Sequence, residues 1–330
     1  MAGHHQVDGS VRIGMDVGGT KTEGVAVDAD GRILARLRRP TEWGPDAVIA
    51  GIVDVTRALA AEAGVEASAI VSVGVGVPGL VDADAGRVLH AVNLGVESLD
   101  IARLAGAELG VPVHVENDVK AAALGAAAVR EDDGSMAYLN LGTGVAAGIV
   151  IGGRLWRGSR GTAGEVGHLP VDPHGRVCGC GQRGCIETLC GGGAVGRAWG
   201  RPGQYPVLDV YDAADAGDAE AVALRAGIAR GAAAAVKALV LAADVETVVI
   251  GGGLTALADR LRPDLLDALR TDAAASPFLA SLRLDERVEL LPSGSPVAAL
   301  GAALLGEASI SAPTTRHNVV TPKKENRTHG

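Results

Sequence analysis

Apolar and polar positions in the first part of the chain predict strands and helices in a fixed order. Residues 11–17 (VRIGMDV) form a nearly unbroken apolar run, which is typical of a buried strand. The next segments predict strands near 23–28 and 32–38, a helix at about 46–63, a strand at 70–77, a helix at 99–109, a strand at 111–115 and an alanine-rich helix from Asn117. The turn at 28–32 (DADGR) indicates a hairpin. The predicted order is therefore βββαβαβα.

The same order begins again at Ser135. The pattern predicts strands at 135–141, at 145–151 and around Leu155, then a helix at 218–243, a strand at 246–250, a helix near 255–270, a strand at 287–291 and a helix at 296–306. Both halves open with three strands and carry a glycine turn after the first of them. This repetition indicates a duplicated domain.

Length, charge and composition narrow the class of protein. A chain of 330 residues is long for one compact core, which favours two domains with a ligand-binding cleft between them. The net charge of −9, without a basic block, argues against nucleic acid and anionic membranes as partners. We expect no apolar run of the ~20 residues that a membrane span needs and no signal peptide, and hence a cytoplasmic protein. The 48 glycines are about twice the usual share and require an explanation.

Three glycine turns follow predicted strands. They are Asp16-Val-Gly-Gly-Thr-Lys21, Gly142-Thr-Gly144 and Gly251-Gly-Gly253. Backbone N–H groups at such turns can approach a phosphate closely, and equivalent strand ends would converge on one cleft, so we expect a bound nucleotide. The candidate contacts are Asp16, Gly18, Gly19, Thr20, Lys21, Thr143, Gly144, Gly251, Gly252 and Gly253. Asp16 is also a candidate ligand of Mg²⁺. An ordinary tight hairpin is the alternative for the first turn.

Glu116-Asn117-Asp118 lies where a predicted strand enters the alanine-rich helix. Asn or Asp is a normal N-cap there, but capping accounts for one of the two better than for both. Phosphoryl transfer needs a carboxylate near the attacking hydroxyl and a polar group that orients the acceptor. Asp118 as base and Asn117 as orienting group meet that need. The glycine-rich loop ending at Gly79 can approach the same ligand, with simple turn geometry as the alternative.

All four cysteines lie between positions 178 and 190. In a reducing compartment this clustering suggests a metal or redox site before a disulfide framework. The candidate zinc ligands are His168, Cys178, Cys180 and Cys185. One histidine and three thiolates fill a tetrahedral shell, so the zinc would be structural and would hold Glu165, His168 and Glu187 in place. A redox pair and free buried thiols are the alternatives, and Cys190 is assigned to the core.

Together these residues resemble the ROK family of sugar kinases, repressors and uncharacterised reading frames. The matching segments are DVGGTK at 16–21, GVGVPGLVD at 74–82, ENDVKAAALG at 116–125, LGTG at 141–144, the stretch 161–187 and VVIGGG at 248–253. The resemblance implies an α/β, actin-like (ribonuclease H-like) duplicated βββαβαβα two-domain kinase fold that uses ATP, catalytic Mg²⁺ and structural Zn²⁺. It implies Asp118 as the base and zinc on the four candidate ligands. The candidate sugar contacts are Gly79, Asn93, Asn117, Asp118, Glu165, His168 and Glu187.

The resemblance also suggests how the chain is divided. We expect a flexible N-terminus (1–10), a small domain (11–116) to which a helix at 293–306 returns, a large domain (117–292) with a zinc-binding insert (165–187), and a disordered tail (307–330). It suggests a homodimer or homotetramer.

Departures from the glucokinase-like pattern affect the choice of acceptor. Val96 and Glu97 stand where a tryptophan is usual, Ala126 replaces an acidic residue, and LGTG does not continue through consecutive glycines. Phosphorylation of glucose or N-acetylglucosamine at the 6-hydroxyl is the first hypothesis. A kinase of an amino sugar or C7-cyclitol, or a non-catalytic sugar-sensing regulator, is the alternative. A DNA-binding repressor is disfavoured because little chain precedes Asp16.

Overall fold

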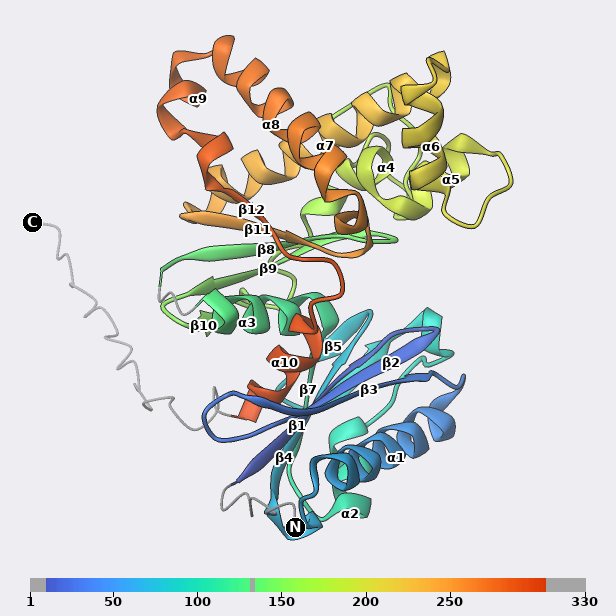
Figure 1. The fold of residues 1–330 in the computed structure, drawn as a ribbon, viewed down its shortest axis with the longest axis vertical. Coiled ribbons are helices and arrows are strands. Elements are labelled where there is room, and N and C mark those ends of the chain that lie inside the picture. Colours follow the sequence, from blue (N-terminus) through green and yellow to red (C-terminus); the bar gives the residue numbers. More distant parts are fainter. Residues whose placement is uncertain (1–9, 131–133, 307–330) are drawn as a thin grey trace, which may run out of the picture.

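Two five-stranded sheets with the same strand order frame the protein (Figure 1). The computed structural model describes residues 10–130 and 134–306, so the expected flexible N-terminus, apart from Ser10, and the expected tail lie outside the described residues. The sheet orders are β3-β2-β1-β4-β7 and β10-β9-β8-β11-β12. In each sheet three strands pair antiparallel and two more are added in parallel. The predicted duplicated actin-like fold is confirmed.

The strands of the first sheet are β1 (Val11–Val17), β2 (Lys21–Val27), β3 (Ile33–Pro40), β4 (Ile70–Val77) and β7 (Val113–Asn117). Those of the second sheet are β8 (Met136–Leu141), β9 (Val145–Ile151), β10 (Arg154–Leu155), β11 (Thr247–Gly251) and β12 (Val288–Leu290). A separate hairpin is formed by β5 (Leu80–Asp82) and β6 (Arg87–His90).

The helices are α1 (Pro45–Ala63), α2 (Ile101–Leu109), α3 (Asp118–Arg130), α4 (Ile186–Cys190), α5 (Gly192–Trp199), α6 (Pro206–Asp215), α7 (Ala219–Ala243), α8 (Ala258–Ala274), α9 (Pro277–Leu282) and α10 (Val297–Ala303). Short 3₁₀ helices lie at Ala67–Ala69, Val92–Leu94, Val166–His168, Gly253–Leu257 and Leu284–Arg287. In Figure 1, α1 and α2 cover the outer face of the first sheet, α4 to α9 lie beyond the second, and α3 and α10 lie between the two sheets.

Close backbone contacts of α10 account for part of the glycine excess. A Cβ atom on Gly14 of β1 would lie 2.0 Å from Ala299 O, and one on Gly74 of β4 would lie 1.8 Å from Ala302 O. Between the helices, a Cβ on Gly301 would lie 1.8 Å from Ala121 O of α3. Only glycine permits these approaches, because any larger residue would collide with main-chain atoms that cannot move aside.

Some elements were not predicted from the sequence. The hairpin β5–β6 was missed because its strands are short and mostly exposed, without clear alternation. Helix α5 was missed because it begins with two glycines, which are poor helix formers. The helix predicted near 255–270 is a 3₁₀ helix followed by α8, which continues to Ala274.

Helix α7 corrects one expectation from the sequence. It is long and apolar enough, by length and composition alone, to cross a membrane. However, 56% of its most apolar stretch of 18 residues is buried inside the protein. Ile228, Val236 and Leu239 lie in the core that α7 shares with the second sheet. A core helix passes the same test, so we read α7 as one.

The crossing of α3 and α10 yields a stability prediction. We expect Gly301→Ala to lower the free energy of unfolding by about 2 kcal/mol or more, because overpacking forces backbone shifts. The matched control is Gly51→Ala in α1, where an added Cβ meets nothing within 4 Å. That change is expected to be neutral or to stabilise by up to about 1 kcal/mol, the difference in helix propensity. Urea unfolding of both variants measures this, and equal midpoints would contradict the proposed tight crossing.

Candidate active site

The carboxyl ends of strands from both sheets open onto one cleft of about 1350 Å³. β1 ends at Val17, β7 at Asn117 and β8 at Leu141, and the loops after them form its walls. The predicted site residues that line it are Asp16, Gly18, Gly19, Lys21, Gly79, Asn93, Asn117, Asp118, Thr143, Gly144, Glu165, His168, Glu187 and Gly253. The structure therefore brings the candidate nucleotide and sugar residues together.

Three predicted nucleotide contacts lie outside this cleft. Gly251 and Gly252 line an adjoining cavity of about 410 Å³, which shares Asp16 and Asp118 with the cleft. Thr20 lines neither cavity; it is exposed, and its carbonyl oxygen accepts a hydrogen bond from Thr41 N at 3.1 Å. Of the first glycine turn, the structure thus directs Gly18, Gly19 and Lys21 to the cleft but not Thr20.

Asn117 and Asp118 stand at the junction of β7 and α3. Asn117 Oδ1 accepts from the backbone N–H groups of Val119 and Lys120 at 3.0 and 3.2 Å, so Asn117 caps the helix. Its Nδ2 donates to Gly79 O at 3.2 Å. Asp118 Oδ1 accepts from Val119 N at 2.9 Å, while Oδ2 has no hydrogen-bond partner among the residues the structure describes. One carboxylate oxygen of Asp118 is therefore available to a ligand.

Burial disfavours ionisation of two carboxyl groups in the cleft, those of Asp118 and Asp16. It raises the pKa of Asp118, and the nearby charge of Glu165 adds to this, whereas the Val119 N–H bond and Lys120 act the other way. Burial, helped by the charges of Asp118 and Glu23, raises the pKa of Asp16 to about 7. Two such carboxylates in one cleft favour binding of a proton or of a cation.

Glu187 connects the cysteine-rich segment to a phosphate-type turn. Its Oε2 accepts from Val145 N at 3.0 Å, at the start of β9. A Cβ on Gly144 would lie 2.8 Å from the same oxygen, so a larger residue there would push the Glu187 carboxylate aside. Gly192 N and Gly193 N donate to the carbonyl groups of Gly142 and Thr143 at 2.8 and 2.9 Å. The turn is thus held by α4 and by the start of α5.

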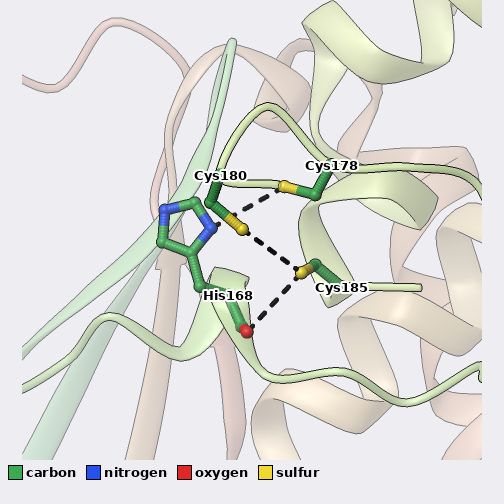
Figure 2. A group of neighbouring side chains, drawn as sticks. All are labelled: His168, Cys178, Cys180 and Cys185. Carbon is green, nitrogen blue, oxygen red and sulfur yellow. Dashed lines mark hydrogen bonds between the residues drawn. The ribbon is translucent and has the colours of Figure 1, made fainter. Parts of the chain in front are cut away.

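The candidate metal ligands converge as Figure 2 shows. One ligand atom from each of His168, Cys178, Cys180 and Cys185 lies within 4.8 Å of all the others. Cys180 Sγ lies 3.7 Å from Cys185 Sγ, and Cys178 Sγ lies 3.8 Å from His168 Nδ1. Cys190 is fully buried in the core and is not part of this group.

Two thiols of this cluster differ in acidity. Hydrogen bonds from Gln182 lower the pKa of the exposed Cys180 thiol to about 6, while burial and the neighbouring thiols raise the pKa of Cys185 to about 12. His168 turns Nδ1 toward the sulfurs and its other edge away from them (Figure 2), and it also lines the cleft. His168 therefore links the cluster to the cleft, and so does Glu187, whose Oε1 lies 4.0 Å from Cys178 Sγ.

Part of the cleft wall was missed in the sequence. Gly192, Gly193 and Gly196 of α5 and the segment Tyr205–Leu208 line it beside Leu254. The run Gly191-Gly192-Gly193 is a signal that could have pointed to this wall. Beside the loop in which Val96 and Glu97 replace the usual tryptophan, the ring of Trp43 packs against Gly95, where a Cβ would lie 2.4 Å from it.

Comparisons with known proteins agree with this architecture. The ROK family model matches residues 12–308. A glucokinase of Halalkalibacterium halodurans is 33% identical over 270 residues, which cover 76% of this chain and 82% of that protein. The structure of a ROK hexokinase from Thermus thermophilus matches with a TM-score of 0.76 and 34% identity, covering 89% of this chain and 97% of that one. A ROK family glucokinase from Streptomyces griseus in complex with glucose and AMPPNP matches with a TM-score of 0.69 and 30% identity, covering 89% and 98%. The chain belongs to the ROK family.

Proposed function

We propose that the protein is an ATP-dependent kinase that phosphorylates a hexose or hexose derivative, glucose or N-acetylglucosamine, at the 6-hydroxyl. The observation that carries this proposal is the half-buried Asp118 carboxylate, which shares one cleft with the glycine turns of both sheets. Similarity to a glucokinase solved with glucose and AMPPNP supports the choice of both substrates. Similarity to glucokinases supports sugar kinase activity whichever sugar the protein phosphorylates.

The nucleotide is proposed to bind along the glycine turns. Backbone N–H groups at Gly19, Thr143 and Gly144 can donate to phosphate oxygens, because the glycines of these turns let a phosphate approach closely. Gly18 N already donates to Lys21 O at 3.0 Å and so shapes the first turn. Asp16 would bind Mg²⁺, directly or through water, and the ion would neutralise charge on the transferred phosphoryl group. The apolar wall at Leu254 is proposed to contact the nucleobase of ATP.

The acceptor is proposed to bind on the other side of Asp118. Polar groups from Asn117, Glu165, His168 and Glu187, with Gly79 and Asn93, surround that part of the cleft. As the sugar hydroxyl attacks the terminal phosphorus in line, Asp118 accepts its proton. Closure of the small domain, 11–116 with 293–306, upon the large domain, 117–292, would exclude water and so suppress ATP hydrolysis. We place this enzyme in the cytoplasm as a homodimer or homotetramer.

We further propose that the cysteine cluster holds structural zinc. Two thiolates at the usual Zn–S distance of about 2.3 Å lie about 3.8 Å apart in a tetrahedron. The Cys180–Cys185 separation of 3.7 Å fits this value. His168 would be ligated through Nδ1, which leaves Nε2 for the cleft. The metal would thereby fix the side chain of a proposed sugar contact.

A specific observation favours a different acceptor. Val96 is buried and Glu97 exposed in the loop after Asn93, so the acceptor side differs from the glucokinase-like pattern. This difference favours an amino sugar or C7-cyclitol as the next candidate acceptor. A sugar-sensing regulator would keep the sugar contacts and lack turnover. ADP release with Mg²⁺-ATP across glucose, N-acetylglucosamine, N-acetylmannosamine, mannose, fructose, kanosamine and a C7-cyclitol separates these, and silence across the panel would contradict the kinase.

Removal of the proposed base is the first test of mechanism. We expect Asp118→Asn to lower kcat by at least ~10²-fold, the range for lost general-base catalysis. Because the folded pKa of Asp118 is raised above its unfolded value, ionised Asp118 costs stability as the pH rises through the folded pKa. The variant is therefore expected to unfold no more easily than the wild type at pH 8. Near-normal turnover would remove Asp118 from the role.

The pH dependence of kcat follows from the same direction of shift. A base must be ionised, so kcat is expected to fall as the pH drops through the raised pKa of Asp118, above the usual aspartate value of about 3.9. A second limb that belongs to Asp16, with a pKa near 7 in the free protein, is expected to move to lower pH as the Mg²⁺ concentration rises. Initial rates between pH 4.5 and 8 at two Mg²⁺ concentrations measure both. A kcat that does not fall at the acidic end of this range would argue against a general base with a raised pKa.

Loss of one cysteine tests the metal. We expect Cys180→Ser to bind no zinc and to lower the Tm by about 5 °C or more, because structural zinc couples binding to folding. Cys190→Ala is the matched control, since it removes a thiol outside the cluster and is expected to retain one zinc per chain. Elemental analysis and thermal unfolding give both readouts. A Cys180→Ser protein that is metal-free and as stable as the wild type would refute a structural zinc.

A further inference from the structure

Two charged side chains flank the Asn117–Asp118 pair, and both are buried. Glu116 in β7 is 2% exposed, and Lys120 in the first turn of α3 is 5% exposed. Buried charges are costly unless they are paired or hydrogen-bonded. Neither side chain is assigned a contact with the nucleotide or the acceptor above, so their partners are informative.

Both side chains find a partner in one short segment, each 41 residues further along the chain. Arg157 Nε donates to Glu116 Oε2 at 2.6 Å, and Lys120 Nζ donates to Gly161 O at 2.6 Å. Residues 157–161, here named the bridging segment, are thus fastened at both ends to the strand-to-helix junction that carries Asp118. Charge-assisted hydrogen bonds of this length are among the strong ones.

The bridging segment leads directly to Glu165. Ala163 N donates to Arg157 O at 3.2 Å, which folds the segment back on itself. Gly164, with φ of 94°, packs on β9, where its O accepts from Ala147 N at 2.7 Å. The chain before Glu165 is therefore held at two places, by β9 and by the junction. The position of Glu165 relative to Asp118 depends on both.

Glu116 acts on the junction as well. Its Oε1 accepts from Asn117 N at 2.9 Å while Oε2 accepts from Arg157. One carboxylate thus joins the backbone of a proposed sugar contact to the bridging segment. Within residues 10–130 and 134–306, by contrast, no hydrogen bond joins the bridging segment to the glycine turns at 18–19, 142–144 or 251–253.

We propose that Glu116 and Lys120 are positioning residues for the acceptor, which hold Glu165 opposite Asp118 through the bridging segment. The inference rests on the proposed function in so far as it assigns Glu165 to the sugar. Since the segment is not bonded to the phosphate-type turns, its release loosens the acceptor side of the cleft and leaves the nucleotide side in place.

Substitution at either end of the segment tests this. Lys120→Met keeps the apolar stem and removes the ammonium group; it is expected to raise KM for the acceptor about tenfold or more, as a hydrogen bond to a charged group contributes at least that factor. KM for ATP is expected to stay within about twofold of wild type on the same argument. Arg157→Gln, at the other end, is expected to give the same split. Lys237→Met, which breaks an ion pair with Asp272 between α7 and α8, is the matched control and should change neither KM.

Amide hydrogen exchange of residues 156–168, without ligands, gives a readout independent of activity. Exchange is expected to be faster in Lys120→Met and Arg157→Gln and unchanged in Lys237→Met. If the wild type phosphorylates no acceptor, the proposed function fails while the exchange result still decides the positioning role.

Unchanged exchange in this segment overturns the proposal, as does a parallel rise of both KM values with a lower Tm. If Lys120→Met does not fold, Arg157→Gln decides, because the Arg157 side chain is 39% exposed and tolerates replacement more readily.

Discussion

The main chains of α3 and α10 meet without side chains between them, at Gly125 and Gly301. A Cβ on Gly125 would lie 1.9 Å from Val297 O, and one on Gly301 would lie 1.8 Å from Ala121 O. Helix α10 also packs on β1 and β4 of the first sheet, while α3 packs on β8 and β9 of the second. Because the contact is between main chains, it fixes how the two sheets face each other. Asp118, the first residue of α3, reaches the cleft at the angle that this contact sets.

The cleft then brings together charges that resist burial. Asp16 enters from β1 and Asp118 from α3, and burial raises the pKa of both. Neither group is stabilised by an ion pair of its own in the described part of the chain, so each gains most when a cation or a proton arrives. The proposed ligands would therefore stabilise the cleft. A metal ion bound with the nucleotide, or the proton of an acceptor hydroxyl, would offset part of the desolvation free energy of a carboxylate.

Much of this arrangement could be predicted from the sequence, and the reason is local. Buried strands give continuous apolar runs, and groups that follow them, such as Asp16 and Asp118, can be placed at sheet ends without knowledge of any distant contact. The pairs Glu116–Arg157 and Lys120–Gly161 could not be found in this way, because 41 residues separate the partners and no pattern joins them. Thr20 does not line the cleft for a related reason: a motif specifies the turn, but the direction of each side chain depends on how the neighbouring chain packs.

One side of the cleft is formed by main-chain turns and the other by side chains. This difference decides at which side residues can be substituted. The side of the cleft that we propose for the nucleotide consists of strand ends and glycine backbone, where an added Cβ would contact protein, as at Gly144 beside Glu187. The side that we propose for the acceptor consists of side chains held by cross-links: His168 to the cysteine cluster, Glu187 to β9, and the bridging segment to the junction. A cross-linked loop can exchange the residues between its anchors while the anchors keep its course. On the proposed assignment, phosphate binding is constrained by the main chain, whereas the choice of acceptor rests on side chains that can change without disturbing the phosphate turns.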